Sequence, residues 1–124
     1  MSVRVRRAYD PPEADDGQRV LVDRLWPRGL AKESAGLSSW ERTVAPSDQL
    51  RMWYAHVPKR YPEFARRYRA ELADADRSEA LDRLAQLAAE ETLTLLTATK
   101  DPAHSQAEVI KEVLQERAER SRKS

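Results

Sequence analysis

The chain has 124 residues and a mass of 14.2 kDa, a length that fits one domain able to bury a core of its own. Its 22 Lys and Arg residues balance 21 Asp and Glu residues, which excludes a bulk polycation such as a histone tail. The charge is nevertheless uneven: residues 1–70 hold 14 basic and 9 acidic side chains, whereas residues 71–124 hold 8 basic and 12 acidic ones. The absence of cysteine excludes disulfide frameworks, thiolate metal sites and cysteine nucleophiles.

Several further classes of protein are also disfavoured. No apolar run approaches the roughly 20 residues of a membrane span, and the N-terminal MSVRVRR lacks the apolar core of a signal peptide. The two histidines, His56 and His104, leave little for a histidine-based metal site. The chain has no GxGxxG, GxxxxGK[ST], GxSxG or HExxH motif. We therefore expect a cytoplasmic protein without a metal site or a cofactor.

The first third of the chain predicts two strands joined by turns. Alternating apolar and basic residues over 3–6 predict a short strand with one buried face. Residues 10–17, with two prolines, a glycine and four acids, predict an exposed turn. The apolar run 20–22 predicts an interior strand that ends in a Trp-Pro-Arg-Gly turn. Residues 30–45 then predict an irregular connection.

Apolar residues at helical spacing predict three helices in the middle of the chain. The first begins at Ser47, a good N-cap, and is ended by Pro58. The second begins near Pro62, which the first turn of a helix tolerates, and places one apolar stripe against the core. The third spans about 78–90. Together they supply enough apolar surface to cover a sheet.

The last third predicts a strand followed by a helix. The β-branched run 92–99 predicts the second interior strand. Ser105 and Glu108 fit a capping box that opens a final helix, and the basic tail from about residue 117 is expected to fray. Strands separated by helices indicate an α/β fold. We predict a small single domain over residues 1–124, with a mainly parallel sheet and helices packed on its faces.

This fold class predicts where a ligand binds. In parallel sheets, ligands lie beyond the carboxyl ends of the strands and near helix N-termini. Both interior strands end in charged residues, so we expect these residues to converge on a basic cleft. Arginine binds phosphate and carboxylate groups through its planar fork, and tryptophan offers an apolar face. The predicted ligand is an anionic small molecule, held by Arg7, Tyr9, Arg24, Trp26, Arg28, Lys100, His104 and Ser105.

Catalysis at this cleft is a separate question. Asp23, Asp101 and His104 are the candidate groups for proton transfer, although no partner spacing supports a catalytic assignment. The same residues also fit a scaffold, in which Asp23 pairs with an arginine, Trp26 covers the core and Ser105 is an ordinary helix cap. The sequence leaves both interpretations open, and with them the question of enzymatic activity.

Two other functions compete with the cleft. Residues 59–69 interleave cations with aromatic side chains, which is typical of a nucleic-acid surface and equally of a solvated helix face. A third interpretation is a protein-interaction domain or a homo-oligomer, in which exposed Trp40 or Trp53 lies in an apolar contact patch.

Four segments resemble a known family. The segments are RAYDPP (7–12) with RVLVDRLWPRG (19–29), APSDQLRMWYAH (45–56), YPEFARRYRAEL (61–72) and LLTATKDPAHSQAEVIKEVL (95–114). They resemble the domain-of-unknown-function 488 family, in its YeaO-like branch. The resemblance covers nearly the whole chain and implies a compact α/β domain, but no reaction. Where relatives often have Asn-His after the histidine of the last segment, this chain has Ser105-Gln106, which argues against an obligatory second histidine there.

Overall fold

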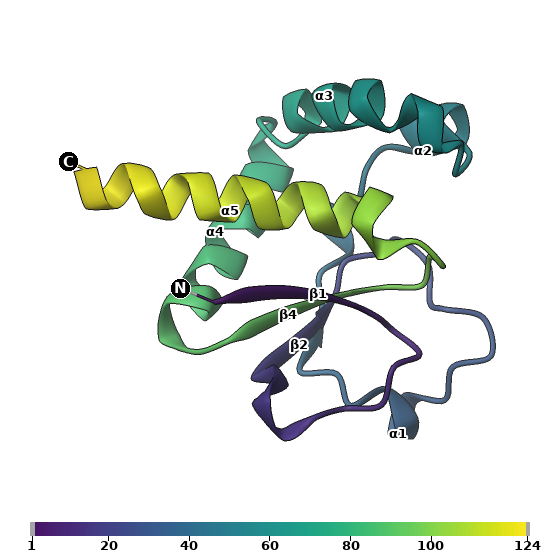
Figure 1. Ribbon diagram of the computed structural model, residues 1–124, viewed down its shortest axis with the longest axis vertical. Coiled ribbons are helices and arrows are strands. Elements are labelled where there is room, and N and C mark those ends of the chain that lie inside the picture. Colours follow the sequence, from purple (N-terminus) through teal and green to yellow (C-terminus); the bar gives the residue numbers. More distant parts are fainter. Residues whose placement is uncertain (1, 124) are drawn as a thin grey trace.

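The computed structural model describes residues 2–123, which form a four-stranded parallel sheet and the helices that cover it (Figure 1). Along the sheet the strands follow the order β1-β4-β2-β3. Strand β4 pairs with β1 on one side and with β2 on the other, so that Leu95 lies opposite both Val5 and Val20. The strands are β1 (Val3–Arg7), β2 (Gln18–Leu21), β3 (Ser39–Trp40) and β4 (Leu93–Thr97).

The helices fill the connections between these strands. Four short 3-10 turns are η1 (Ala14–Asp16), η2 (Arg42–Val44), η3 (Pro58–Arg60) and η4 (Pro102–His104). The α-helices are α1 (Lys32–Ala35), α2 (Asp48–Tyr54), α3 (Tyr61–Glu71), α4 (Ala75–Glu90) and α5 (Gln106–Lys123). These elements confirm the predicted α/β class, with β2 and β4 as the two interior strands.

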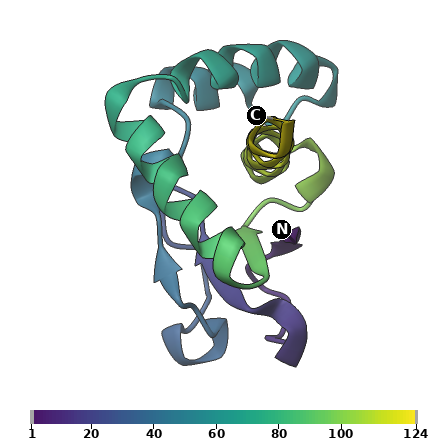
Figure 2. The ribbon, with the colours of Figure 1, turned by 90° about the vertical axis from the view of Figure 1, so that its left-hand side faces the viewer.

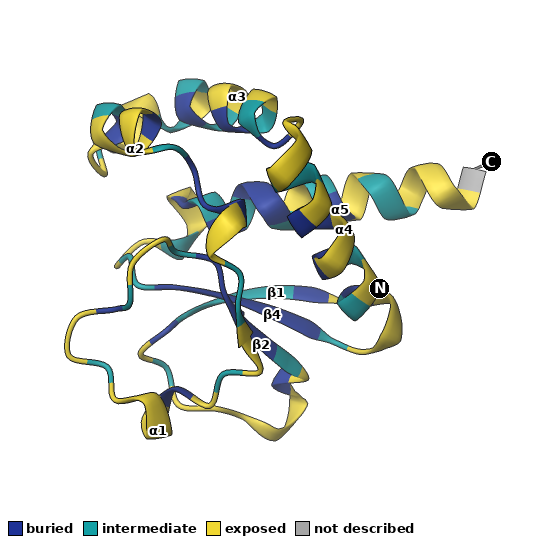
Figure 3. Cartoon of the chain, turned by 180° about the vertical axis from the view of Figure 1, so that it is seen from behind, coloured by how far each residue is buried: buried dark blue, intermediate teal, exposed yellow. Residues whose placement is uncertain are grey.

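The two faces of the sheet are covered differently. The main core packs alternate strand residues such as Val20 and Leu95 against α2, α3, α4 and α5. Figure 2, in which α5 is seen end-on, shows these long helices on one side of the sheet. On the other face, Leu21 and Leu96 pack against Trp26 and its neighbours in the long connection from β2 to β3. The central strands are therefore buried on both faces, as Figure 3 shows.

Helix α2 ends earlier than the sequence predicts. Its N-cap is Ser47 as expected, since the Ser47 Oγ accepts a hydrogen bond from the Leu50 amide at 3.2 Å. The helix stops at Tyr54, however, because Ala55 and His56 adopt left-handed backbone with φ of 47° and 56°. Pro58 instead lies in the following turn, η3. The left-handed pair changes the direction of the chain after α2, and His56 itself is exposed.

Two other predictions at helix starts need correction. Helix α4 begins at Ala75, before the predicted start, because the Asp74 side chain accepts from the Arg77 amide at 2.8 Å and caps it. The prediction of a capping box at the start of α5 is wrong. The Ser105 Oγ donates to the Pro102 carbonyl at 2.7 Å, and the Glu108 Oε2 is buried without a hydrogen-bond partner. Ser105 therefore closes the η4 turn.

The C-terminal helix is the longest element. Helix α5 continues to Lys123, through the basic tail that the sequence predicts to fray. Ion pairs link this helix to its neighbours, where Arg69 of α3 approaches Glu116 at 2.9 Å and Arg117 approaches Asp82 of α4 at 2.9 Å. Within residues 2–123, no helix is both long and apolar enough to cross a membrane.

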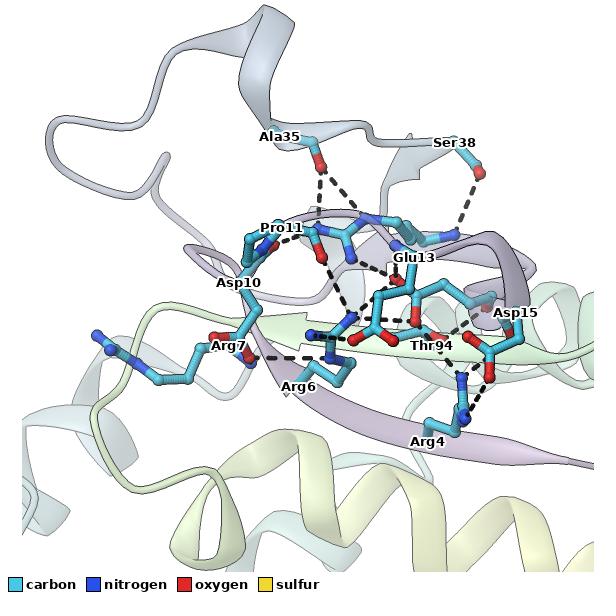
Figure 4. A network of polar contacts seen from close by, with 12 residues as sticks. Arg4, Arg6, Arg7, Asp10, Pro11, Glu13, Asp15, Ala35, Ser38 and Thr94 are labelled. Carbon is cyan, nitrogen blue, oxygen red and sulfur yellow. Dashed lines mark hydrogen bonds and ion pairs between the residues drawn. The ribbon is translucent and has the colours of Figure 1, made fainter.

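The acidic segment 10–17 is mostly exposed, as predicted, but Asp16 is buried with 1% of its surface accessible. Its carboxylate lies 2.6 Å from Arg19 and 3.0 Å from Arg6, and it also accepts from the Glu13 amide at 3.0 Å (Figure 4). Arg19 is itself buried and donates to the Ala35 carbonyl. A paired and fully hydrogen-bonded carboxylate can be buried, which is why this acid departs from its exposed neighbours.

Candidate functional site

A cleft of about 320 Å³ opens at the carboxyl ends of β2 and β4, facing α2 and the start of α5. The segment after β2 supplies Asp23 through Arg28, and the end of β4 supplies Thr97 through Thr99. Helix α2 contributes Arg51 and Tyr54. Because β2 and β4 are neighbouring parallel strands, their carboxyl ends meet at one edge, which is the position predicted for a ligand site.

Asp23 fixes the floor of the cleft. The Ala98 amide donates to its Oδ2 at 2.8 Å, and the Gln106 Nε2 donates to its Oδ1 at 2.5 Å. Burial raises the pKa of Asp23, although these hydrogen bonds favour the charged form and oppose the rise. The arrangement corrects the scaffold interpretation in which Asp23 pairs with an arginine. Asp23 instead ties the ends of β2 and β4 to the first turn of α5.

Arginines line the mouth of the cleft in different states. Arg24 and Arg51 both approach Asp48, at 3.5 Å and 3.4 Å, in exposed pairs that contribute little to stability. Arg28 also lines the cleft, and among the described residues its guanidinium has no ion pair. The backbone beside it is fixed, because the Tyr9 hydroxyl donates to the Arg28 carbonyl at 2.8 Å. Arg28 is therefore a cation with its donors free.

Both histidines of the chain reach the cleft. The His104 Nδ1 lies 2.7 Å from the Asp101 Oδ2, which orients the ring, and the ring of Tyr61 lies edge-on to it at 5.2 Å. His56 arrives through the left-handed backbone after α2. Within the described part of the chain, no group of three His, Asp or Glu side chains could hold a metal ion.

The structure brings together most of the residues predicted for the cleft. Those that line it are Tyr9, Arg24, Trp26, Arg28, His104 and Ser105, together with the candidate base Asp23. The exceptions are Arg7, Lys100 and Asp101, which lie outside.

The exceptions have physical reasons. The Arg7 Nε donates to the Thr99 carbonyl at 3.1 Å, and its guanidinium stacks on the Tyr9 ring at 5.1 Å, so Arg7 supports the wall from behind. Lys100 is exposed in the turn after β4. Asp101 is also exposed and holds His104. Neighbouring residues in the turn after a strand can point in different directions. The spacing of residues in the sequence does not predict which of them face the cleft.

Several polar residues that line the cleft were not part of the predicted site, among them Arg51 and Gln106. Gln106 directly follows Ser105, so its place at the opening of α5 was a usable signal. The position of Arg51 in the sequence does not indicate a place in the cleft, because the way α2 packs decides which face of this helix is turned toward the sheet.

Three of the five cations in the basic segment 59–69 pair with carboxylates in the fold. Arg66 and Arg67 both pair with Glu63, at 2.6 Å and 2.7 Å, and Arg69 pairs with Glu116. Arg67 also lies over the ring of Trp53 at 4.3 Å. These contacts occupy cations that a nucleic-acid surface would present to phosphates.

The predicted apolar contact patch also looks different in the fold. Trp40 is half-buried against Trp26, with ring centroids 5.5 Å apart, and Trp53 is half-buried under arginines. The exposed large hydrophobic side chains within residues 2–123 are instead Tyr9, which is 40% accessible, and Leu25 and Met52, each 64% accessible. They do not form the tryptophan patch that the oligomer interpretation expects.

Comparison with known proteins supports the resemblance seen in the sequence. A family model described as the inactive DUF488-N3 subclade matches residues 2–124. The chain belongs to this family. Among its DUF488 relatives, the uncharacterized protein Rv3073c of Mycobacterium tuberculosis is 47% identical over 112 residues, covering 90% of this chain and 92% of the relative. The uncharacterized protein YeaO of Escherichia coli is 39% identical over 110 residues, covering 89% and 94%. No solved structure matches this DUF488 protein.

Proposed function

We propose that the strand-end cleft binds a small molecule that joins a phosphate or carboxylate group to an apolar, preferably aromatic, body. The observation that carries this proposal is the charge of the lining. Three arginines and two histidines face the cleft with one carboxylate, Asp23, whose two oxygens are already hydrogen-bonded inside the protein. The free donors of Arg28 suit an anionic group, since charge-assisted hydrogen bonds are the strong ones.

The walls between these cations favour an aromatic body. Tyr9, Trp26, Tyr54 and Phe64 all line the cleft. Its volume of about 320 Å³ lies at the lower end of the range for small-molecule sites. A small ring with one anionic substituent matches both the size and the mixture of apolar and cationic walls.

Binding is a better-supported role than turnover. The family to which the chain belongs is described as an inactive subclade. Within the cleft, the candidate base Asp23 accepts two internal hydrogen bonds, and His104 is held by an exposed carboxylate. These groups are arranged as supports for the walls, and we propose a binding protein for a small anion.

Phenyl phosphate is a suitable probe, because it has both parts of the proposed ligand. Thermal unfolding of the wild-type protein is measured over a titration, alongside the same titration of Arg28→Ala. A ligand that binds only the folded state stabilises it by about 2.7 kcal/mol at 100 times its Kd. We expect a saturable rise in Tm for the wild type and a strongly reduced rise for Arg28→Ala.

Arg66→Ala is the matched control, because Arg66 is an exposed arginine paired on the surface of α3. It should respond to phenyl phosphate as the wild type does. Absence of any saturable rise in the wild type, or equal rises in all three proteins, would contradict the proposal. Benzoate, tested in parallel, tells whether a carboxylate replaces the phosphate.

A further inference from the structure

A second hollow, of about 240 Å³, lies beside the cleft and is lined almost wholly by polar side chains. Its walls are Arg24, Arg42, Thr43, Ala45 and Arg77. The three arginines come from three separate elements: the segment after β2, the turn η2 and the first turn of α4. The ligand site proposed above does not depend on these three arginines lying together.

Arg77 is held in place by the fold, whereas Arg24 is not. The Arg77 Nε donates to the Ala45 carbonyl at 2.8 Å, and its guanidinium pairs with Asp74 at 2.6 Å. The Arg77 side chain is 20% exposed, so most of its length is fixed against the protein. Arg24 makes only the long exposed pair with Asp48, at 3.5 Å. Arg77 is thus a rigid wall, and Arg24 is free to turn toward an anion.

Arg42 is the cation without a counter-charge. Its guanidinium lies over the ring of Trp40 at 4.7 Å, and among residues 2–123 it has no carboxylate partner. The stacking holds the planar group in a defined orientation and leaves its N–H donors available at the ring edge. Its neighbour Glu41 does not neutralise it, because Glu41 pairs with Arg83 at 2.9 Å.

Asp74 and Asp48 pair with Arg77 and Arg24 from outside the lining, so the uncompensated charge in this hollow is that of Arg42, and a bound anion would provide its counter-charge. We propose that Arg24, Arg42 and Arg77 form a phosphate-binding site. The ligand is a dianionic phosphate group, either free or as a monoester. Arginine forks match the geometry of a phosphate, and the Thr43 hydroxyl adds a neutral donor in the same hollow.

This site is separate from the proposed cleft, although the two hollows share a wall. Arg24 and Ala45 line both, Arg28 lines the cleft alone, and Arg42 lines the second hollow alone. Substitution of Arg42 therefore tests the second site, and substitution of Arg28 tests the first. If the test of one site fails, the other site can still be tested.

The test follows the side-chain Nε–H signals of the arginines by NMR while inorganic phosphate is added to the full chain. We expect saturable shifts at Arg24, Arg42 and Arg77 in the wild type. Arg42→Gln should bind phosphate at least about tenfold more weakly, the loss expected for hydrogen bonds to a charged group. Arg42 is exposed, so the variant should stay folded, which its amide spectrum verifies.

Arg66→Gln is the control for a general loss of charge, and it should bind phosphate as the wild type does. Arg28→Ala should also retain the shifts at Arg42 and Arg77. The proposal is overturned if the wild type gives no saturable shift, if Arg42→Gln binds with unchanged affinity, or if the shifts disappear in Arg28→Ala instead. Methyl phosphate in place of phosphate distinguishes the sources: equal affinity supports a monoester, and much weaker binding supports free phosphate.

Discussion

Asp16 is the residue whose burial the fold compensates most completely. Burial alone would raise its pKa, but the Glu13 amide, Arg19 and Arg6 stabilise the charged form, and the pKa lies below its ordinary value of 3.8. The folded state therefore gains stability from ionised Asp16 above the pKa of the unfolded chain. That contribution is lost as the pH falls through the lower, folded pKa.

Asp16→Asn removes the charge and leaves Arg19 buried without its carboxylate. We expect a loss of about 3–5 kcal/mol in the free energy of unfolding at pH 7, the usual cost of breaking a buried ion pair on one side. Urea denaturation measures it. The variant should also lose less stability than the wild type when the pH is lowered below about 4.

Asp15→Asn is the neighbouring control. Asp15 pairs with Arg4 at 3.1 Å on the surface, where its side chain is 69% exposed, so the change in unfolding free energy should be small. Equal effects of the two substitutions would show that the buried network around Asp16 adds nothing to the free energy of unfolding.

Among the secondary-structure elements, α2 shows most clearly what the sequence could predict. The N-cap Ser47 was predictable, because its hydroxyl satisfies the Leu50 amide by a local rule. The end of the helix was not, since alanine and histidine adopt the left-handed region much less readily than glycine, yet Ala55 and His56 both occupy it. The helix is held in place instead by the packing of Tyr54. The ring centroids of Tyr54 and Phe64 lie 4.4 Å apart in a stacked pair.

Ala55→Gly should therefore stabilise the protein. Glycine adopts φ of 47° without the steric cost that alanine has there, and we expect a gain of about 1 kcal/mol in the free energy of unfolding. Chemical denaturation of the variant and the wild type gives the difference.

Ala70→Gly provides the opposite control, at an exposed position inside α3. It should cost about 0.5–1 kcal/mol, because glycine there only adds flexibility to the unfolded chain. A loss of stability in Ala55→Gly similar to that in Ala70→Gly would contradict the left-handed cap.

At the scale of the whole molecule, the location of the site could be predicted from the order of strands and helices along the sequence. Interior strands recognised from the runs at 20–22 and 92–99 became the neighbours β2 and β4, and their ends converge as parallel strands must. What spacing could not predict was side-chain direction. Arg28 and His104 turn toward the cleft, whereas Lys100 turns outward.

The distribution of charge in space also differs from its distribution along the chain. The net charge is +1, and the basic excess lies in residues 1–70. In the fold, carboxylates of α3 and α5 pair with Arg66, Arg67 and Arg69 of the segment 59–69. Within residues 2–123, Arg28 and Arg42 have no ion pair and lie near the strand ends. A nearly neutral protein thus presents two unpaired arginines near the ends of its strands.

The three tryptophans offer the most direct test of the proposed cleft, through their indole N–H signals in a titration with phenyl phosphate. Trp26 lines the cleft, whereas Trp53 lies on the 59–69 surface under Arg67. We predict a saturable shift of the Trp26 signal while the Trp53 signal stays in place. A shift of Trp53 with Trp26 unmoved would contradict the account and assign anion binding to the basic surface of α3.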